Sequence, residues 1–374
     1  KLVPDLKNNR LEVIAYTEDK ELQVTAIADN GTSEVARTEG NSNMSFYLPI
    51  RKPRLWSPDD PFLYGLKLQL KDRKGEIIDE VSSYFGMRSV SMGKVDGVLR
   101  PLLNGEFVFH IGLLDQGYWP DGAFTAPTDE ALLYDIELAK RAGFNVIRKH
   151  IKVEPQRCDR LGLMVWQDMP NLWEPDGEDS VAVRKQFRDE LKVMIDQHVS
   201  SPSIVMWVPF NENWGAFEAT DITAWVKKYD PNRWVNGMSG YNYAPGYRKA
   251  YGDPGNGDFV DMHHYGKIEP KAIPRPDDKR AASLGEFGGK GLFVRGHMWP
   301  VRNDAYETDT YVLMLTELEQ MINYFGLSTA IYTQTTDVEH EINGLVTYDR
   351  KVEKMDLEKV KYINQEVIKC TRAK

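Results

Sequence analysis

The chain has few cysteines and no long hydrophobic run. Cys158 and Cys370 are the only cysteines among 374 residues, too few for a disulfide framework or a metal cluster, and we interpret both as structural thiols. No apolar stretch approaches the roughly 18 residues that span a bilayer, so a membrane partner is not expected. The chain opens at Lys1 without an initiator methionine or signal peptide. We expect a processed or cut N-terminus, which leaves the compartment open.

Basic charge is also in deficit. The chain has 47 Lys and Arg residues and 56 Asp and Glu residues, which gives a net charge of −9. Nucleic acids and anionic membranes attract basic surfaces, so neither is expected as a partner. A hydrophobic content of 41% with 28% charged residues is ordinary for a soluble globular protein, and the length allows two domains.

Metal-binding motifs are missing as well. His263 and His264 are adjacent on a predicted strand and would point to opposite faces, so both cannot bind one ion. No His-x-His or His-Glu-x-x-His motif accompanies them. We expect neither a metal nor an organic cofactor, and keep a metal-dependent hydrolase as an alternative. One histidine of the pair should face the site, and His264 is included among the candidate substrate-binding residues.

The first part of the chain, residues 1–95, has the pattern of an all-β domain. Short strand-like runs alternate with turns about every ten residues, and helical periodicity is absent. This spacing predicts a β-sandwich of immunoglobulin type. The predicted strands cover residues 10–17, 22–28, 44–50, 63–70 and 77–83, with a turn at 72–75.

In the second part, residues 96–374, strands and helices alternate, which predicts a parallel sheet with helical crossovers. Eight β/α units in this length are typical of a TIM (β/α)8 barrel. Helices are predicted over residues 129–142, 187–199, around 222–229 and 356–370. The predicted strands are 107–113, 145–150, 163–168, the run from 204 that ends at 212, 234–239, 259–265, 281–287 and 329–334. Only residues 151–162 separate the second strand from the third, so that helix is a single turn or part of the segment is missing.

Two of the strands end in a carboxylate. Asn211 and Glu212 follow the apolar run from 204, and Glu286 closes the run from 281 among glycines. Active sites of TIM barrels lie at the carboxyl ends of the strands. Glycoside hydrolysis uses two carboxyl groups, about 5–5.5 Å apart when the second is a nucleophile. We therefore predict Glu212 and Glu286 as catalytic, the alternative for each being an ion pair with an arginine or a helix cap.

Further polar and aromatic side chains are predicted at the same end. Arg148 and His150 close one strand and Asp168 the next, which suits a pocket for a polyol; the alternative is a salt-bridge network bracing the barrel mouth. Tyr265 follows the histidine pair. Aromatic rings stack on the apolar faces of sugars, so tryptophans on predicted loops are candidates, with packing as the equal alternative. These are Trp119, Trp173, Trp214 and Trp299.

These residues resemble glycoside hydrolase family 2, the family of β-galactosidases, β-glucuronidases and β-mannosidases. The resemblance covers nearly the whole chain and rests most on the paired signatures around Glu212 and Glu286. It implies an immunoglobulin-like domain followed by a catalytic barrel. The motifs are Leu55-Trp56-Ser57-Pro58, Phe85-Gly86-Met87-Arg88, Leu103-Asn104-Gly105, Asn145-Val146-Ile147-Arg148, Met164-Val165-Trp166-Gln167-Asp168, Pro202-Ser203-Ile204-Val205-Met206-Trp207 with Asn211-Glu212, and Gly285-Glu286-Phe287-Gly288.

The resemblance also implies roles. Glu212 would be the acid/base and Glu286 the nucleophile; Asn211 would bind the sugar 2-hydroxyl, Tyr265 would hydrogen-bond the nucleophile, and His150 and Asp168 would line the sugar subsite. Val208-Pro209-Phe210 replaces the small residues that often precede Asn-Glu. The family's N-terminal jelly-roll domain is absent, so the chain resembles a fragment with an incomplete pocket. The Asn-x-Lys motif of the glucuronidases is not evident after Glu286.

We therefore expect a retaining exo-β-glycosidase acting on an oligosaccharide or glycoside, with a β-galactosidase as the first expectation. A β-glucuronidase or β-mannosidase, or a non-catalytic sugar-binding barrel, is the alternative. A periplasmic or secreted location is expected from the trimmed start, with a cytoplasmic one left open, and a homo-oligomer is compatible with this interpretation.

Overall fold

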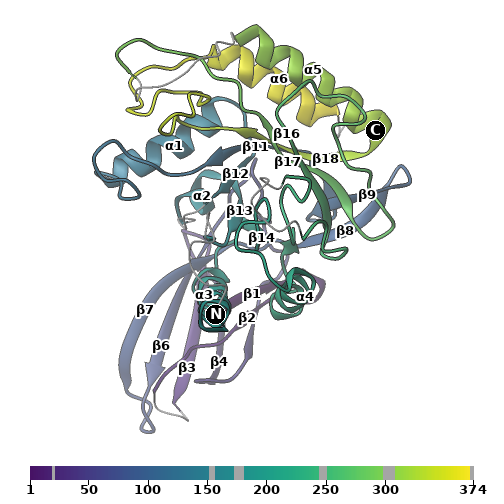
Figure 1. Ribbon diagram of the computed structural model, residues 1–374. Helices are drawn as coiled ribbons and strands as arrows, with labels where there is room; N and C mark the ends of the chain where they lie inside the picture. Colours follow the sequence, from purple (N-terminus) through teal and green to yellow (C-terminus); the bar gives the residue numbers. More distant parts are fainter. Residues whose placement is uncertain (19–21, 151–155, 172–180, 244–250, 298–307, 371–374) are drawn as a thin grey trace.

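The computed structural model describes residues 1–374 except 19–21, 151–155, 172–180, 244–250, 298–307 and 371–374. A β-sandwich at the N-terminus is followed by a barrel of strands with helices outside it, as Figure 1 shows. The predicted fold class is therefore confirmed. No helix in the described ranges is both long and apolar enough to cross a membrane.

The sandwich consists of two antiparallel sheets. One has the order β1 (Leu2–Asp5), β2 (Arg10–Val13) and β5 (Phe46–Pro49); the other has the order β4 (Glu34–Asn41), β3 (Gln23–Asp29), β6 (Tyr64–Lys71) and β7 (Ile77–Phe85). A short 3-10 helix, Leu6–Asn8, links β1 to β2. The facing side chains form one buried core that includes Leu11, Val24, Leu48, Leu66 and Phe85. The sequence did not predict β1 or β4. Strand β4 alternates only between half-buried and exposed residues, so it carries little hydrophobic pattern.

A small antiparallel sheet follows the sandwich, formed by β8 (Val90–Val95), β9 (Val98–Leu103) and β10 (Glu106–Phe107). The β8–β9 turn at Asp96 and Gly97 has a positive φ at both residues. From β9, the buried Arg100 donates to the carbonyl oxygens of Leu327 (2.5 Å) and Ile322 (2.9 Å) in the barrel. This sheet therefore lies against the barrel, and a domain division at residues 95 and 96 stays a prediction.

The barrel is one sheet of eight parallel strands, as predicted. Between β15 and β16, backbone N–H groups of Asp258 and Tyr241 donate to Val235 (2.8 Å) and Asp261 (3.4 Å) and close the ring. The first strand begins later than predicted, because Phe107 belongs to β10. In spatial order the strands are β15 (Trp234–Val235), β14 (Ile204–Val208), β13 (Met164–Asp168), β12 (Val146–Lys149), β11 (His110–Asp115), β18 (Leu327–Thr333), β17 (Ala281–Gly288) and β16 (Phe259–His264).

Helices lie on the outside of the barrel. The Thr128 hydroxyl caps the first helix by accepting from the Ala131 N–H (3.2 Å). The helix after β12 has only six residues, which accounts for the short crossover. One helix was missed, the one between β17 and β18. The helices are α1 (Asp129–Arg141), α2 (Gln156–Leu161), α3 (Val181–His198), α4 (Ala219–Tyr229), α5 (Thr308–Phe325) and α6 (Leu357–Cys370).

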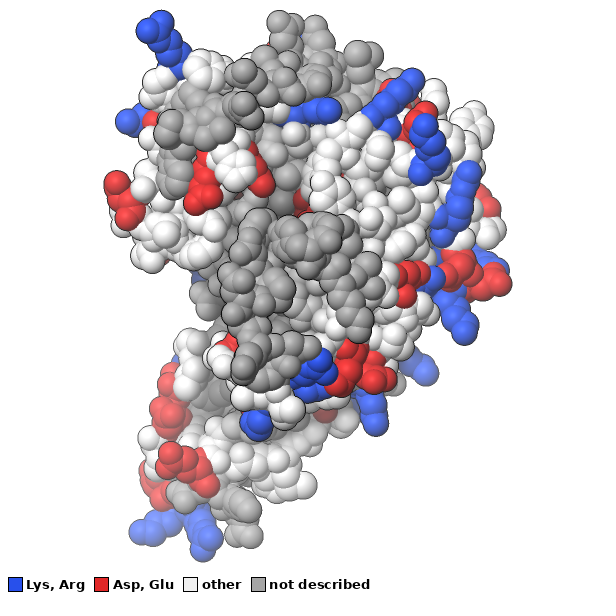
Figure 2. All heavy atoms as spheres, viewed as in Figure 1, with Lys and Arg blue, Asp and Glu red and all other residues white. Residues whose placement is uncertain are grey.

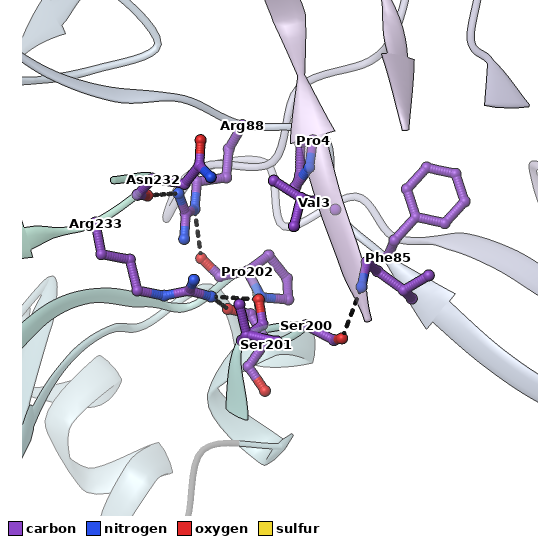
Figure 3. Close-up of a pocket in the computed structure, with 12 residues that line it drawn as sticks. Val3, Pro4, Phe85, Arg88, Ser200, Ser201, Pro202, Asn232 and Arg233 are labelled. Atoms are coloured by element: carbon purple, nitrogen blue, oxygen red, sulfur yellow. Dashed lines mark hydrogen bonds between the residues drawn. The ribbon is translucent and has the colours of Figure 1, made fainter. Parts of the chain in front are cut away.

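Buried arginines fix the sandwich to the barrel. Arg88, just after β7, donates to the carbonyl oxygens of Pro202 (3.0 Å), Ile204 (2.7 Å) and Asn232 (2.8 Å). Figure 3 shows Arg88 beside Arg233 at a small pocket where β1 meets the barrel. These bonds anchor the amino end of β14, and the Asn-Glu pair follows the carboxyl end of the same strand.

Candidate active site

The two predicted catalytic glutamates lie together at the carboxyl end of the barrel. Glu286 is in β17, and Glu212 follows β14 with its backbone N–H donated to the Ser239 carbonyl (2.9 Å). Glu212 has a φ of +47°, a left-handed conformation that a non-glycine residue adopts at a cost. Both residues are buried: 7% of the surface of Glu212 and 4% of that of Glu286 are exposed. One carboxylate oxygen of each lies within 4.8 Å of the other and of a ring nitrogen of His263.

Arg148, in β12, connects the members of this site. Its guanidinium is fully buried and donates to Asp168 Oδ2 (2.7 Å), Asn211 Oδ1 (2.7 Å) and Glu286 Oε1 (3.2 Å). Burial opposes the charged form, but Asp168 and Glu286 together raise the pKa of Arg148 above its ordinary value. A permanent cation therefore holds the nucleophile candidate and the amide of Asn211 in one geometry.

Glu286 is held in its ionised form. The Tyr265 hydroxyl donates to Glu286 Oε2 at 2.5 Å, and the Thr333 hydroxyl donates to the same atom at 3.3 Å. Burial alone would raise the pKa of Glu286. The positive charges of His263 and Arg148 and the Tyr265 hydrogen bond outweigh burial, so the pKa lies below the ordinary value. An ionised carboxylate is what a nucleophile requires.

His263 contacts the other glutamate and begins a buried chain of hydrogen bonds. Its Nδ1 lies 2.7 Å from Glu212 Oε1, and its Nε2 lies 2.9 Å from Ser239 Oγ. The Ser239 hydroxyl donates to Asp261 Oδ2 (3.0 Å), which leaves its oxygen to accept from Nε2–H. Burial favours the neutral ring, but Glu286 and Glu212 raise the pKa of His263 above its ordinary value. With Nδ1 facing Glu212 and Nε2 facing Ser239, both ring nitrogens can donate, which favours the charged imidazolium beside the two glutamates.

The remaining predicted residues divide into two groups. His150 Nδ1 lies 2.8 Å from Asp168 Oδ2, and the Trp214 ring packs 5.3 Å from the His150 ring, so all three border the Arg148 network. His264 lies apart from this cluster, with its Nε2 at 2.9 Å from the Lys267 carbonyl oxygen. Trp299 and Trp173 lie outside the described residues. Trp119 is buried beneath the Arg350 guanidinium, so its position indicates packing.

Glu212, His263 and Glu286 are also the group that could offer ligands to a metal ion. The chemistry of the donors is unfavourable for one. Both nitrogens of His263 already face hydrogen-bond partners, and Glu286 Oε1 accepts from the fixed cation Arg148. A divalent ion here would have to displace these contacts and lie close to a guanidinium.

Comparison with known proteins agrees with this geometry. The family model described as Glycosyl hydrolases family 2 matches residues 2–88. A β-galactosidase of Halalkalibacterium halodurans is 25% identical over 382 residues, covering 95% of this chain and 36% of its own length. A β-galactosidase of Psychromonas ingrahamii is 28% identical over 345 residues, covering 83% and 32%. These comparisons support glycoside hydrolase family 2 as the family that the chain is most similar to in both sequence and fold. The chain spans about a third of the length of these two relatives.

The relatives of this chain carry more than one substrate in their names. A putative β-glucuronidase of Formosa agariphila is 30% identical over 221 residues, covering 56% of this chain and 21% of its own length. Two solved structures share the fold of this chain. A β-glucuronidase described as FMN-binding, from Facaelibacterium prausnitzii, has a TM-score of 0.75 at 22% identity (98% of this chain, 61% of that one). A β-galacturonidase of Eisenbergiella tayi bound to galacturonate has a TM-score of 0.72 at 19% identity (98% and 71%).

Several residues of this site were missed by the sequence interpretation. Ser239, Asp261 and Thr333 contact the cluster but were not named as site residues, and His264 was preferred over His263. Thr333 and Ser239 lie at or just past the carboxyl ends of β18 and β15, within strands that were predicted. Polar residues at strand ends were therefore the signal that could have found both.

Proposed function

We propose that this chain carries the catalytic barrel of a retaining exo-β-glycosidase. The proposal rests mainly on the two buried carboxylates of Glu212 and Glu286, since one oxygen of each lies within 4.8 Å of one oxygen of the other. An inverting enzyme separates its carboxyl groups by about 6.5–9.5 Å to leave room for a water, whereas a retaining enzyme brings them closer. Glu286 then attacks the anomeric carbon, while Glu212 protonates the departing oxygen.

The surroundings of the two glutamates support this division of roles. Glu286 accepts hydrogen bonds from Tyr265 and Arg148, which stabilise its carboxylate form. Glu212 instead contacts His263, a side chain that can exchange protons. In the second step Glu212 takes the proton of the water that hydrolyses the glycosyl-enzyme. Metal and organic cofactors supply no step in this scheme.

Asn211 is proposed to bind the sugar. Its Oδ1 is fixed by Arg148, while its Nδ2 is buried and has no hydrogen-bond partner among the described residues. A buried amide N–H without a partner costs about 1–3 kcal/mol, which a sugar hydroxyl would recover on binding. Since Arg148 also touches Glu286, the hydroxyl beside the anomeric carbon, the 2-hydroxyl, fits this position.

The proposed substrate is a terminal β-linked sugar, with β-galactosides first and β-glucuronides and β-mannosides as alternatives. The names of the relatives support both galactosides and glucuronides.

A periplasmic or secreted location and a homo-oligomer stay predictions. In Figure 2, the coloured Lys and Arg side chains are interspersed with Asp and Glu over the face shown.

Trapping with 2-deoxy-2-fluoro glycosides tests the proposal. The electronegative fluorine slows hydrolysis of a glycosyl-enzyme, so intact-mass measurement followed by peptide mapping should find one sugar on Glu286. A Glu286→Gln variant is the control and should take no label. A label on another residue would refute the assignment of Glu286, and sugar binding without any label would favour the non-catalytic alternative.

A further inference from the structure

A third carboxylate, Glu341, is built into the rim of the proposed sugar site. It lies in the loop after β18, where its backbone N–H and carbonyl pair with Val338 (2.8 and 3.0 Å). Glu341 is exposed, but its Oε2 accepts hydrogen bonds from Gln334 Nε2 (2.7 Å) and Gln116 Nε2 (3.1 Å). These two amides follow β18 and β11, which are neighbouring strands. An exposed glutamate is thus fixed in place by the barrel itself.

This carboxylate is close to the reacting groups. Gln334 directly follows Thr333, whose hydroxyl contacts the nucleophile Glu286. Burial of the carboxyl group raises the pKa of Glu341, and the charge of Glu286 raises it further. Glu341 in turn contributes to the raised pKa of Tyr265, after burial and the two catalytic glutamates. Through Gln334, Glu341 is held at the carboxyl end of β18, next to the strand β17 that carries Glu286.

We propose that Glu341 is a specificity residue of the sugar subsite, which excludes uronic acids and selects neutral hexosides. The inference rests on the proposed glycosidase function and names its substrate class. A uronic acid carries a carboxylate where a neutral hexose carries a hydroxymethyl group. In this site that carboxylate would add a negative charge beside those of Glu286 and Glu341, since the anomeric carbon must reach Glu286.

Among the described residues, the cations of this cluster already have partners, and His263 contacts Glu212 and Ser239. Arg148 is fully buried and already donates to Asp168, Asn211 and Glu286. A hydroxyl fits Glu341 better, because its Oε1 receives no hydrogen bond from the described part of the chain and can accept one from a sugar. Like charges several ångströms apart in a partly buried site cost enough to lower affinity about tenfold or more.

The proposal therefore separates two groups of relatives by chemistry. It places this chain with the proteins named β-galactosidases, and away from those named β-glucuronidase or β-galacturonidase, although all share the fold. The distinction rests on one carboxylate rather than on overall identity, so a single substitution tests it.

The experiment compares kcat/KM for 4-nitrophenyl β-galactoside and β-galacturonide, which differ at the sixth carbon, at one fixed salt concentration. The wild-type protein should prefer the galactoside. Glu341→Gln keeps the shape of the side chain, and should reduce that preference about tenfold by raising kcat/KM for the galacturonide. Glu339→Gln, two residues away on the exposed loop, is the matched control and should leave the ratio unchanged. The corresponding glucoside and glucuronide pair repeats the measurement.

Each outcome decides one point. A wild-type preference for the uronide, or an unchanged ratio in Glu341→Gln, overturns the role of Glu341 while leaving the glycosidase proposal in place. If no glycoside is turned over, the glycosidase proposal fails, and calorimetric binding of galactose against galacturonate to the wild type and Glu341→Gln still tests the carboxylate. Equal weakening of both sugars in the variant would overturn the specificity role.

Discussion

The Nδ1 atom of His263 lies 2.7 Å from Oε1 of Glu212, while the opposite nitrogen of the ring faces Ser239 at 2.9 Å. The ring therefore joins the proposed acid/base to the buried carboxylate of Asp261 through one hydroxyl. Burial raises the pKa of Asp261, although the positive charge of His263 partly opposes this. Asp261, Ser239, His263 and Glu212 thus form one continuous chain of hydrogen bonds.

The charge on His263 should make part of the stability depend on pH. Its pKa in the folded protein is raised, so its stabilisation is present below the unfolded value near 6.5 and is lost as pH rises through the folded value. The Tm difference between the wild type and His263→Asn should therefore be larger at about pH 5.5 than at about pH 8.5. His264→Asn is the control, since that ring lies outside the cluster. A pH-independent difference would contradict the imidazolium assignment.

Loss of the Tyr265 hydroxyl should affect the nucleophile directly. Tyr265→Phe removes the 2.5 Å hydrogen bond that lowers the pKa of Glu286, so that pKa should rise. The acid limb of the kcat/KM profile should then move to higher pH. A hydrogen bond to a charged group contributes about 1.5–3 kcal/mol, so activity should fall roughly 10- to 150-fold. A drop in rate with an unmoved acid limb would indicate that Tyr265 acts only through packing.

The β-sandwich, the eight barrel strands and the strand-end positions of both glutamates could be predicted from the sequence. Each rested on local information: a period of two in the sandwich, apolar runs in the barrel, and a polar residue where a run ends. Trp166, Trp207 and Trp234 lie within these apolar runs, and all three are at most 1% exposed.

What could not be predicted depends on side-chain direction and distant contacts. Alternation along β16 separates His263 from His264, but which of them faces inward depends on strand register, and the pairing with β17 shifts at that point. Helix α5 was missed although Leu318, Met321 and Ile322 form a buried stripe. The amides that hold Glu341 lie 7 and 225 residues away from it, and only the closed barrel brings them together.

Substitution of Glu212 should give an effect that depends on the leaving group. Glu212→Gln cannot donate a proton to the departing oxygen, so substrates with poor leaving groups should lose roughly 10²–10⁴-fold in rate. A 2,4-dinitrophenyl glycoside needs no such proton, and its first step should remain fast and show a burst of phenol before slow turnover. Equal losses for both kinds of substrate would refute the acid/base role of Glu212.

Removal of metal ions should leave turnover unchanged. The Glu212, His263 and Glu286 ligand atoms lie within 4.8 Å of one another but are already engaged with Arg148 and Ser239. Activity after dialysis against a chelator should match the untreated protein. Loss that zinc, magnesium or manganese restores would establish the metal-dependent alternative instead.

Arg148 should be the most costly single side chain of the site to remove. Its guanidinium is fully buried between Asp168, Asn211 and Glu286, so Arg148→Met leaves two buried carboxylates without their cation. Breaking a buried ion pair on one side destabilises a protein by about 3–5 kcal/mol. Urea unfolding should show a loss of that size, whereas Arg141→Met, which breaks the exposed Arg141–Glu353 pair, should change stability far less. Equal losses in both variants would contradict the network, because the exposed pair is screened by water and the buried one is not.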